Sequence, residues 1–443
     1  MRIRVGIGIC VLASCVVLNT QAWGQVYNEN EKILPSDGAP GHGLGGAVAI
    51  HDEVAILGAK TDGPGSAYIR HLMLDKLPIK LVPLDGAAGD LFAHSVALGS
   101  GSSLGGDLRA VIGAPHNSEL GASSGAAYLF NDTGIQFHKF LPNDGAAEDH
   151  FGHSVAIANG IVAVGSPDDD DNGTNSGSVY LFSVATGMQI NKLTPNDGAQ
   201  NDSFGRAVAM SNGVVAVAAH RHHNGAIEAG AVYLFNASTG AQLAKLQSNE
   251  GVAFEQFGYS LAIDNNKVAI GALATESVYV FDVNTQAQLT KISTASPGNV
   301  FGWSIDIDDN KLIVGAMLDP INGFNSGSAF LFNANTGAPI ADVLPSDGGV
   351  FQQFGSAVAL DKDNLVAGAR NDNQNGASAG AGYYFDIFCP ADLDGDGDLD
   401  IFDVFTFLNL FNIQDPAADF NNDSVFDIFD VFAYLDSFNA GCP

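Results

Sequence analysis

One unit recurs along most of this 443-residue chain and constrains its fold more than any other feature. In its clearest copy, residues 151–199, four short apolar runs alternate with small or polar residues and are separated by turn-forming residues. A period of two between Asn-Gly, Asp and Pro clusters is typical of β-strands joined by tight turns. We therefore expect each copy to form a four-stranded antiparallel meander.

Each copy opens with a large apolar residue followed by a small one, and this opening occurs seven times. The intervals between openings range from 44 to 59 residues, which is the period of propeller blades. The second strand of most copies ends in Gly-Ala or Gly-Ser, and the third ends in Tyr-Leu-Phe or a variant of it. The openings are Leu44-Gly45, Phe92-Ala93, Phe151-Gly152, Phe204-Gly205, Phe257-Gly258, Phe301-Gly302 and Phe354-Gly355.

The last copy stops after its third strand, and its missing fourth strand is found at the other end of the chain. Residues 32–39 (KILPSDGA) match residues 192–199 (KLTPNDGA), which include the fourth strand of the clearest copy. An N-terminal strand in that place would pair an otherwise exposed edge and close a ring. We therefore expect an all-β seven-bladed β-propeller over residues 25–388, whose last blade is completed by an N-terminal strand.

These motifs resemble the FG-GAP repeats of the integrin alpha-chain N-terminal propeller, over about residues 31–386. The resemblance rests on the Phe-Gly opening and on second strands such as Gly113-Ala114-Pro115 and Gly165-Ser166-Pro167. It implies seven four-stranded blades. Integrin-type blades often bind calcium in an acidic loop between their first two strands. The corresponding loops here, such as Ala158-Asn159-Gly160, are too short to surround an ion, so we do not expect calcium in the blades.

Residues 1–24 predict a secretory signal peptide. Two arginines precede an apolar run from Val5 to Leu18, and small residues near Gly24 suit cleavage after it. The run is too short for a membrane-spanning helix with anchoring flanks. We expect an extracellular or cell-surface protein with no transmembrane segment in the mature chain. A lipoprotein attached at Cys15, within a sequence that resembles a lipobox, is the alternative.

The charge of the chain limits its partners. With 49 acidic and 18 basic residues, the net charge is −31, which argues against nucleic acid and anionic membranes and favours divalent cations. Since 46% of residues are apolar and 15% are charged, the composition is that of a folded protein. Beyond the signal, the cysteines are Cys389 and Cys442, and they bracket the last segment. In an oxidising compartment this pair predicts a disulfide bond.

Two loops of the predicted propeller carry possible ligands. Residues 168–172 (DDDDN) are interpreted as a solvated acidic turn, with a weak cation site as the alternative. Residues 220–223 (HRHH) are interpreted as polar surface, because no carboxylate or cysteine stands at metal-ligand spacing. The sequence contains no nucleophile elbow, paired-histidine zinc motif or phosphate-binding loop. We therefore assign no catalytic residues, and leave open whether the chain is an enzyme.

The strongest chemical signal lies in residues 389–443. Within a twelve-residue stretch, oxygen-bearing side chains stand at positions 1, 3, 5, 9 and 12, with Gly397 at position 6, where the chain must turn sharply. This is the ligand spacing of a calcium-binding EF-hand loop, in which position 7 contributes a backbone carbonyl. The predicted ligands are Asp392, Asp394, Asp396, the carbonyl of Asp398, Asp400 and Asp403.

The same spacing recurs 27 residues later. In this copy Ser424 replaces the glycine at position 6, so we expect a second, weaker calcium site. For both loops the alternative is an acidic turn without metal. The ligands predicted for the second loop are Asp419, Asn421, Asp423, the carbonyl of Val425, Asp427 and Asp430.

A short helix is predicted after each loop. Apolar residues follow each loop at helical spacing, and the two stripes are Ile401, Val404, Phe405, Leu408 and Phe411, and Ile428, Val431, Phe432, Leu435 and Phe438.

Two such loop–helix units, with Asp at position 12, resemble a dockerin domain, and the resemblance covers residues 389–443. Dockerins bind cohesin modules, which implies a cohesin-like partner. The resemblance assigns partner contacts to loop positions 10 and 11, which are Ile401, Phe402, Ile428 and Phe429. For Ile401 and Ile428 a place in the core is an equal alternative, whereas both phenylalanines lie off the stripes.

These expectations combine into a secreted, non-catalytic binding or scaffold protein. Its propeller would present loops to a glycan or a protein, and its C-terminal calcium module would tether it to a cohesin-like or cell-surface partner. Dockerin-like modules are commonly attached to polysaccharide-degrading enzymes, so a hydrolase or lyase propeller is one alternative. Integrin-like adhesion is the other.

Overall fold

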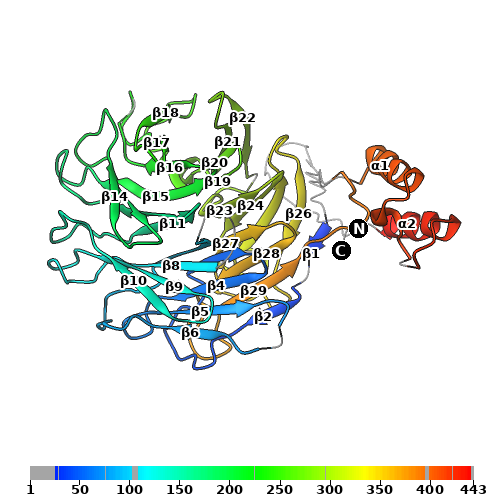
Figure 1. The fold of residues 1–443 in the computed structure, drawn as a ribbon, viewed down its shortest axis with the longest axis horizontal. Helices are drawn as coiled ribbons and strands as arrows, with labels where there is room; N and C mark the ends of the chain where they lie inside the picture. The colour runs from blue at the N-terminus through cyan, green and yellow to red at the C-terminus, as the bar shows by residue number, and fades with distance from the viewer. Residues whose placement is uncertain are drawn as a thin grey trace, which may run out of the picture.

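The computed structural model describes residues 25–27, 29–74, 76–101, 108–223, 225–294, 296–394, 399–421 and 423–440. The predicted signal peptide lies outside these residues. The strands form seven sheets arranged around a centre, and two helices lie to one side of them (Figure 1). The helices are α1 (Ile401–Asn412) and α2 (Ile428–Ala440), and two short 3-10 turns span Leu273–Thr275 and Pro416–Ala418.

Each sheet is one blade, and its strands follow one another from the centre of the ring outwards. Blades 1 to 4 contain β3 (Ala47–His51), β4 (Val54–Ala59), β5 (Ser66–His71) and β6 (Ile79–Leu81); β7 (Ser95–Ser100), β8 (Leu108–Ala114), β9 (Ala126–Asn131) and β10 (Gln136–Phe140); β11 (Ser154–Ala158), β12 (Ile161–Ser166), β13 (Ser178–Ser183) and β14 (Gln189–Leu193); and β15 (Phe204–Ser211), β16 (Val214–Ala219), β17 (Ala231–Asn236) and β18 (Gln242–Leu246). Blades 5 to 7 contain β19 (Phe257–Asp264), β20 (Lys267–Ala272), β21 (Ser277–Asp282) and β22 (Gln288–Ser293); β23 (Ser304–Asp308), β24 (Lys311–Ala316), β25 (Ser328–Asn333), β26 (Pro339–Val343) and β1 (Gln25–Tyr27); and β27 (Phe354–Asp361), β28 (Asn364–Ala369), β29 (Ala381–Asp386) and β2 (Glu31–Ile33).

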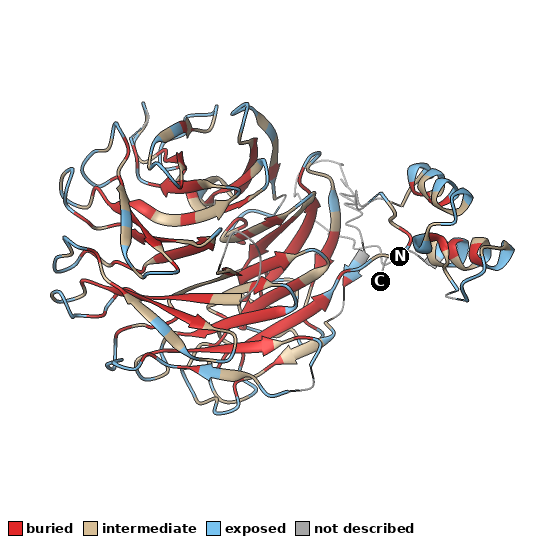
Figure 2. Cartoon of the chain, viewed as in Figure 1, coloured by how far each residue is buried: buried red, intermediate tan, exposed pale blue. Residues whose placement is uncertain are grey.

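The predicted seven-bladed, all-β propeller is therefore confirmed, and blade 3 shows how its sequence produces it. The first hairpin turns through two residues, Asn159 and Gly160, whose φ angles are +51° and +75°. Positive φ at both positions is the geometry that Asn-Gly favours in a tight hairpin. The second and third strands are almost entirely buried, whereas the fourth is half-exposed. Figure 2 shows the same gradient from the interior of each blade to its rim.

The N-terminal strand closes the ring as predicted. Strand β2 pairs antiparallel with β29, with Lys32 opposite Tyr383. A second N-terminal strand was not predicted: β1 pairs in parallel with β26, with Val26 opposite Asp342, and makes blade 6 five-stranded. Three residues give no detectable alternation, so the sequence carries no signal for this addition.

Neighbouring blades meet through the Phe-Gly openings. The Phe151 ring is fully buried and packs edge-on against Tyr180, with ring centroids 5.5 Å apart. Its backbone bridges to Gly125 of the preceding blade. At the next junction, Ser154 Oγ donates a hydrogen bond of 2.8 Å to the carbonyl of Gly205. Across the closure, Ser356 Oγ, which stands one position earlier in its strand than Ser154 does, donates to the carbonyl of Gly45 at 3.1 Å.

Gly165 tests whether close backbone approach holds the ring together. A Cβ at this position would lie 2.1 Å from the carbonyl oxygen of Gly205 in the next blade, a contact that only backbone movement can relieve. We expect Gly165→Ala to destabilise the propeller by about 2–3 kcal/mol, through overpacking against backbone. Urea unfolding followed by circular dichroism measures this.

Gly349→Ala is the matched control, because the nearest side-chain atom would lie 3.9 Å from its Cβ. Equal unfolding midpoints for the two variants would contradict the role assigned to the blade junction.

Candidate functional site: the C-terminal acidic loops and the propeller channel

The first acidic loop brings three predicted ligands together. One carboxylate oxygen each from Asp392, Asp394 and Asp403 lies within 4.8 Å of the others. Asp396 and Asp398 lie outside the described residues, so the rest of the loop stays a prediction. The donors present are carboxylate oxygens, which are the ligands that calcium prefers.

Asp403 connects this loop to helix α1. Its carboxylate is completely buried and accepts hydrogen bonds from the backbone N–H groups of Leu393 (2.8 Å) and Asp400 (2.9 Å). Asp400 in turn accepts from the N–H of Phe402, at 2.7 Å, so that the pair forms a capping box at the start of the helix. Within the described part of the chain, Asp403 has no cationic side chain as a partner. A buried carboxylate without a counter-charge is costly, and a divalent cation fits this position.

The last carboxylate of the second loop is held in the same way, although the described acidic residues of this loop do not form a comparably close group. Asp430 is completely buried and accepts from the N–H groups of Asn421 (3.3 Å) and Asp427 (2.9 Å). Asp419 accepts from the N–H groups of Asp423 and Ser424, at 3.1 and 2.8 Å, so the backbone curls around its carboxylate.

Ser424 occupies the sharp turn of this loop with a φ of +65°. A left-handed conformation costs a non-glycine residue about 1–2 kcal/mol, which is the physical basis for expecting a weaker second site. The next residue, Val425, donates its N–H to Asp423, at 2.8 Å, and so continues the turn.

The two helices pack through a face that the sequence analysis did not identify. Phe407 and Tyr434 are buried and stack in parallel, with ring centroids 4.2 Å apart. They stand four residues after Asp403 and Asp430, one helical turn further along. Because the last carboxylate of each loop must face the loop interior, these residues face the core.

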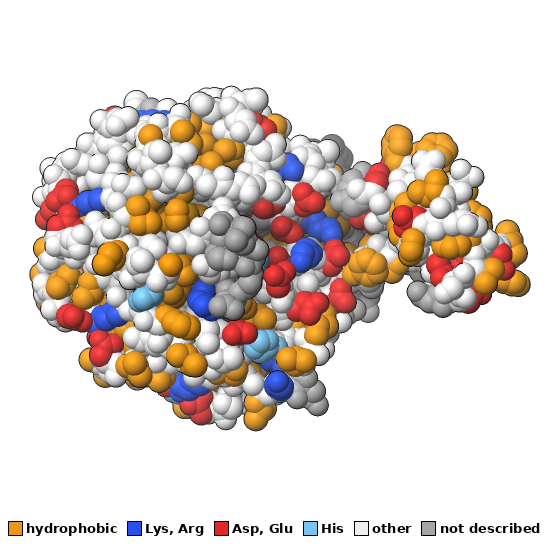
Figure 3. Space-filling model, in the orientation of Figure 1, with side chains coloured by type: hydrophobic (Ala, Val, Ile, Leu, Met, Phe, Trp, Pro, Cys, Tyr) orange, Lys and Arg blue, Asp and Glu red, His pale blue; other side chains and the backbone are white. Residues whose placement is uncertain are grey.

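Both predicted helices are present, but the predicted apolar stripes do not mark their buried faces. Phe405, Leu408, Phe432 and Leu435 are exposed, and so are all four predicted partner contacts. Ile401 and Ile428 are each 54% exposed, which excludes the core alternative for them, and Phe402 and Phe429 are 59% and 62% exposed. Figure 3 shows apolar side chains at several places on the visible face of the helical part. Cys442 lies outside the described residues, so its pairing with Cys389 stays a prediction.

In the propeller, acidic side chains of the loop at residues 168–172 of blade 3 form hydrogen bonds and ion pairs with other residues of the protein. Asp169 is buried and accepts from the Tyr180 hydroxyl, at 2.7 Å, and from Lys192 Nζ, at 3.1 Å. Asp171 also pairs with Lys192, and Asp168 lies 2.8 Å from His150 Nδ1. These contacts argue against a weak cation site, and the burial of Asp169 also departs from the predicted solvated turn.

The same lysine–tyrosine–acid cluster recurs in six blades. In each of them a lysine of the outer strand lies over the ring of a tyrosine in the third strand and pairs with acidic loop residues. Blade 6 has Phe330 and Asp342 at these positions, and it is the blade to which β1 is added. The six lysines are Lys32, Lys80, Lys139, Lys192, Lys245 and Lys291.

The histidine cluster at residues 220–223 is not simply polar surface. His220 and His222 are buried, whereas Arg221 and His223 are exposed and fit the prediction. His222 Nδ1 lies 2.8 Å from Asp202 Oδ2, and its Nε2 lies 2.8 Å from Lys245 Nζ. His222 therefore joins the lysine–tyrosine–acid cluster of blade 4, a role that spacing along the chain could not show.

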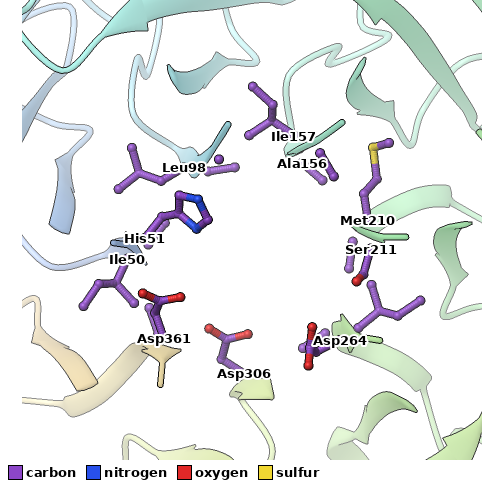
Figure 4. A pocket seen from close by; sticks show the side chains of 18 of the residues that line it. Ile50, His51, Leu98, Ala156, Ile157, Met210, Ser211, Asp264, Asp306 and Asp361 are labelled. Carbon is purple, nitrogen blue, oxygen red and sulfur yellow. The ribbon is translucent and has the colours of Figure 1, made fainter. Parts of the chain in front are cut away.

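The innermost strands enclose a central channel with a cavity of about 520 Å³. Figure 4 shows the carboxylates of Asp264, Asp306 and Asp361 on one side of it and apolar side chains, including Ile157 and Met210, on the other. Burial raises the pKa of Asp306 to about 7, and the charges of neighbouring acidic residues add to the effect.

The channel carboxylates hold neighbouring blades together. Asp264 accepts from the N–H of Asp309 in the next blade, at 3.0 Å, and Asp361 accepts from the N–H of Asp52 across the ring closure, at 2.9 Å. Asp306 accepts from the N–H of Leu360, at 2.8 Å. The sequence analysis missed these residues, although an acidic residue ends the first strand of blades 5, 6 and 7, namely Asp264, Asp308 and Asp361; Asp306 lies two residues earlier in blade 6.

Comparison with known families agrees with this architecture. The FG-GAP repeat family matches the chain at residues 27–70, 78–130, 135–182, 188–235, 241–281, 283–332 and 340–385. The chain belongs to the FG-GAP repeat family. No curated protein matches it in a sequence comparison.

Each FG-GAP segment is offset from the blades by one strand. The segment at 135–182, for example, begins with β10 of blade 2 and ends with β13 of blade 3. Every repeat therefore spans a blade junction, and the first repeat includes β2, the strand that completes blade 7. In the described ranges of this FG-GAP protein, no helix is long and apolar enough to cross a membrane.

Asp306 makes a pH-dependent contribution to stability. The folded pKa of Asp306, about 7, lies above the ordinary value of 3.8. The free energy of unfolding therefore falls as the pH rises from about 4 to about 7, and the full penalty is present above pH 7 and absent below about pH 4. An asparagine side chain at this position would resemble the protonated acid. We expect Asp306→Asn to stabilise the propeller at pH 8 by about 2–4 kcal/mol and to have little effect at pH 4.

Urea unfolding of both proteins across this pH range measures the difference directly. A difference that does not change with pH would show that Asp306 titrates normally.

Proposed function

We propose that this FG-GAP repeat protein is a secreted, calcium-dependent binding protein without catalytic activity. In this proposal the propeller presents a ligand-binding surface, and residues 389–443 form a dockerin-like tether. The observation that carries it is the buried Asp403 carboxylate, which lies beside Asp392 and Asp394 and whose partners among the described residues are backbone N–H groups.

Calcium would be held by the two acidic loops, with the first loop binding more tightly. When bound, calcium supplies positive charge to carboxylates that the fold has removed from water. Asp400 and Asp403 cap helix α1, so they would link ion binding to the start of the helix. For a site of this kind outside the cell, a dissociation constant of about 10⁻⁴–10⁻³ M is sufficient.

The partner would dock on the exposed apolar residues that begin each helix. Ile401 and Phe402 are repeated 27 residues later as Ile428 and Phe429, and all four are more than half exposed. Apolar side chains exposed in this number on a small module are typical of an interaction surface. The repetition favours two equivalent docking faces for a cohesin-like module or a cell-surface partner.

The propeller favours binding over catalysis. Its channel carboxylates are directed at backbone N–H groups of neighbouring blades, and in the outer loops acidic groups are paired with lysines. The observation that favours a second candidate, a polysaccharide-degrading enzyme, is the raised pKa of Asp306 in the channel. Turnover of a polysaccharide that Asp306→Asn abolishes would establish that candidate. Integrin-like adhesion rests on the fold alone.

Calcium titration of the full chain by calorimetry tests the tether. We expect two ions per chain, with the tighter site lost in Asp403→Asn and the weaker one lost in Asp430→Asn. Removing an anionic oxygen ligand from either loop should weaken its site by more than about 100-fold.

Asp436→Asn is the matched control, because Asp436 lies on helix α2 and is exposed. Wild-type titrations without saturable heat would remove the calcium proposal.

Substitution of the two exposed phenylalanines tests the docking surface. We expect Phe402→Ala and Phe429→Ala each to leave binding of a cohesin module largely intact, because either face can serve. The double variant should weaken binding by at least about 100-fold, since buried aromatic anchors dominate interfaces. Surface plasmon resonance with and without calcium measures this, and Phe388→Ala, which alters an exposed phenylalanine before the loops, is the control.

An unchanged affinity of the double variant would place the partner elsewhere.

A further inference from the structure

One end of the propeller channel is surrounded by cationic and aromatic side chains. Five of them follow directly on the opening pair of residues in blades 2 to 6, and two stand at the ends of the second strands of blades 1 and 7. The residues that line the cavity begin two positions further along each inner strand, for example at Val96 and Val155. The cationic and aromatic side chains therefore lie at the end of the channel opposite Asp264 and Asp361. We call them the cationic ring: Lys60, His94, His153, Arg206, Tyr259, Trp303 and Arg370.

The members of the cationic ring contact one another in blade order. Lys60 Nζ lies 3.2 Å from His94 Nδ1, and the rings of His94 and His153 are 4.8 Å apart. Arg206 lies 3.3 Å from His153 Nε2. On its other side, the Arg206 guanidinium carbon lies 4.9 Å from the centre of the Tyr259 ring.

The remaining contacts extend the ring to blade 7. The Tyr259 and Trp303 rings are 5.3 Å apart, and the Arg370 guanidinium carbon lies 5.7 Å from the centre of the Trp303 ring. The Trp303 indole donates to the carbonyl of Ser356, at 3.1 Å, which fixes its orientation. One side chain from each of the seven blades therefore contributes to a single surface.

The cations of this ring lack carboxylate partners. In the described parts of the chain, Lys60, Arg206 and Arg370 form no ion pair, although acidic residues outnumber basic ones by 49 to 18. Burial lowers the pKa of Lys60, and the charges of Arg370 and Arg206 lower it further. By contrast, the outer-strand lysines all pair with acidic groups. Unpaired, half-buried cations of like charge repel one another, so the fold maintains this arrangement at a cost in stability.

Two histidines near the cationic ring have a buried ring nitrogen without a partner. His220 follows the second strand of blade 4 and is 5% exposed, and its Nδ1 has no hydrogen-bond partner among the residues that the structure describes. The Nδ1 atom of His153 is likewise buried and without a partner among these residues. Burial, together with the charges of Arg206 and Arg221, lowers the pKa of His220 to about 3, so the imidazole is neutral and one of its nitrogens can donate a hydrogen bond. Buried polar atoms normally have partners.

We propose that the cationic ring binds an oxyanion, a carboxylate or sulfate group of the propeller's ligand. The proposal rests on the binding role proposed above and names the ligand chemistry. Guanidinium groups offer paired N–H donors that match the oxygen spacing of carboxylates and sulfates. A half-buried position strengthens each such bond relative to water. The same charges exclude a metal cation from this end of the channel.

Trp303 reports on the site directly. The sequence contains two tryptophans, Trp23 and Trp303, so a full chain carrying Trp23→Phe has Trp303 as its one tryptophan. We expect sodium sulfate, titrated at constant ionic strength against sodium chloride, to change its fluorescence saturably. Arg206→Gln and Arg370→Gln should each raise the sulfate dissociation constant by about tenfold or more, because each removes charge-assisted hydrogen bonds.

Lys267→Gln is the matched control. Lys267 donates to the Asp309 carbonyl and to Asn310 Oδ1, at 2.9 and 2.8 Å, and in the described part of the chain it also has no carboxylate partner, but it belongs to the first hairpin of blade 5, at the opposite end of the channel. Its loss should leave sulfate binding unchanged. Lys60→Met provides a further ring variant if an arginine variant does not fold.

Two further titrations identify the source of the oxyanion. Glucuronate binding more tightly than sulfate, with no response to glucose, would indicate a sugar-borne carboxylate, and equal responses would indicate the oxyanion alone; both support the site. No saturable response of the wild type to either anion would overturn the proposal, as would ring variants that bind like Lys267→Gln. The calcium loops are separate from the ring, so calcium binding can succeed where this test fails.

Discussion

The structure depends on the close approach of neighbouring blades at their glycines. Gly165 lies against the carbonyl of Gly205, and the same carbonyl accepts the Ser154 hydroxyl. A side chain at either glycine would separate the two sheets at the point where they are nearest. Serine-to-glycine bonds of this kind occur at five of the seven blade junctions, and the one from Ser356 to Gly45 closes the ring. One local fit, repeated with small changes, thus joins consecutive blades and also closes the ring.

Ring closure makes the two ends of the channel chemically different. At one end, Asp264 and Asp361 satisfy backbone donors of the following blade, so acidic charge is used to hold the ring together. At the other end, Arg206 and Arg370 stand at blade positions where they meet aromatic rings rather than carboxylates. Although the protein is strongly acidic, these cations have no carboxylate partners in the described part of the chain. Its ability to bind anions is therefore concentrated at this end of the channel. The two ends differ because the repeated blades carry different residues at equivalent positions.

Repetition explains which features the sequence could predict. The strands of blade 3 could be predicted because the other six blades repeat their pattern. The pairing of Lys32 with Tyr383 in blade 7 could be predicted for the same reason, since residues 32–39 match the fourth strand of another blade. Strand β1 could not be predicted, since three residues carry no period and its partner is set by the closed ring. His222 was misinterpreted because its partners, Asp202 and Lys245, come from other segments of the blade. In the acidic loops the spacing predicted the ligands, and Asp392, Asp394 and Asp403 do meet, but apolar periodicity alone could not tell which helix face is buried.

The helix faces follow from the position of the last loop carboxylate. With Asp403 directed into its loop, the residue one turn later, Phe407, must face the core, and Ile401 and Phe402 are then turned towards solvent. The same rotation relates Asp430 to Tyr434 in the second unit. In the proposed calcium-bound form, the ion would compensate the buried carboxylate and thereby hold the helix in the rotation that exposes the docking residues. Without an ion, the uncompensated charge favours release of Asp403 to water, which would turn Phe407 out of its stack with Tyr434. Metal binding and partner binding are then two consequences of one helix orientation.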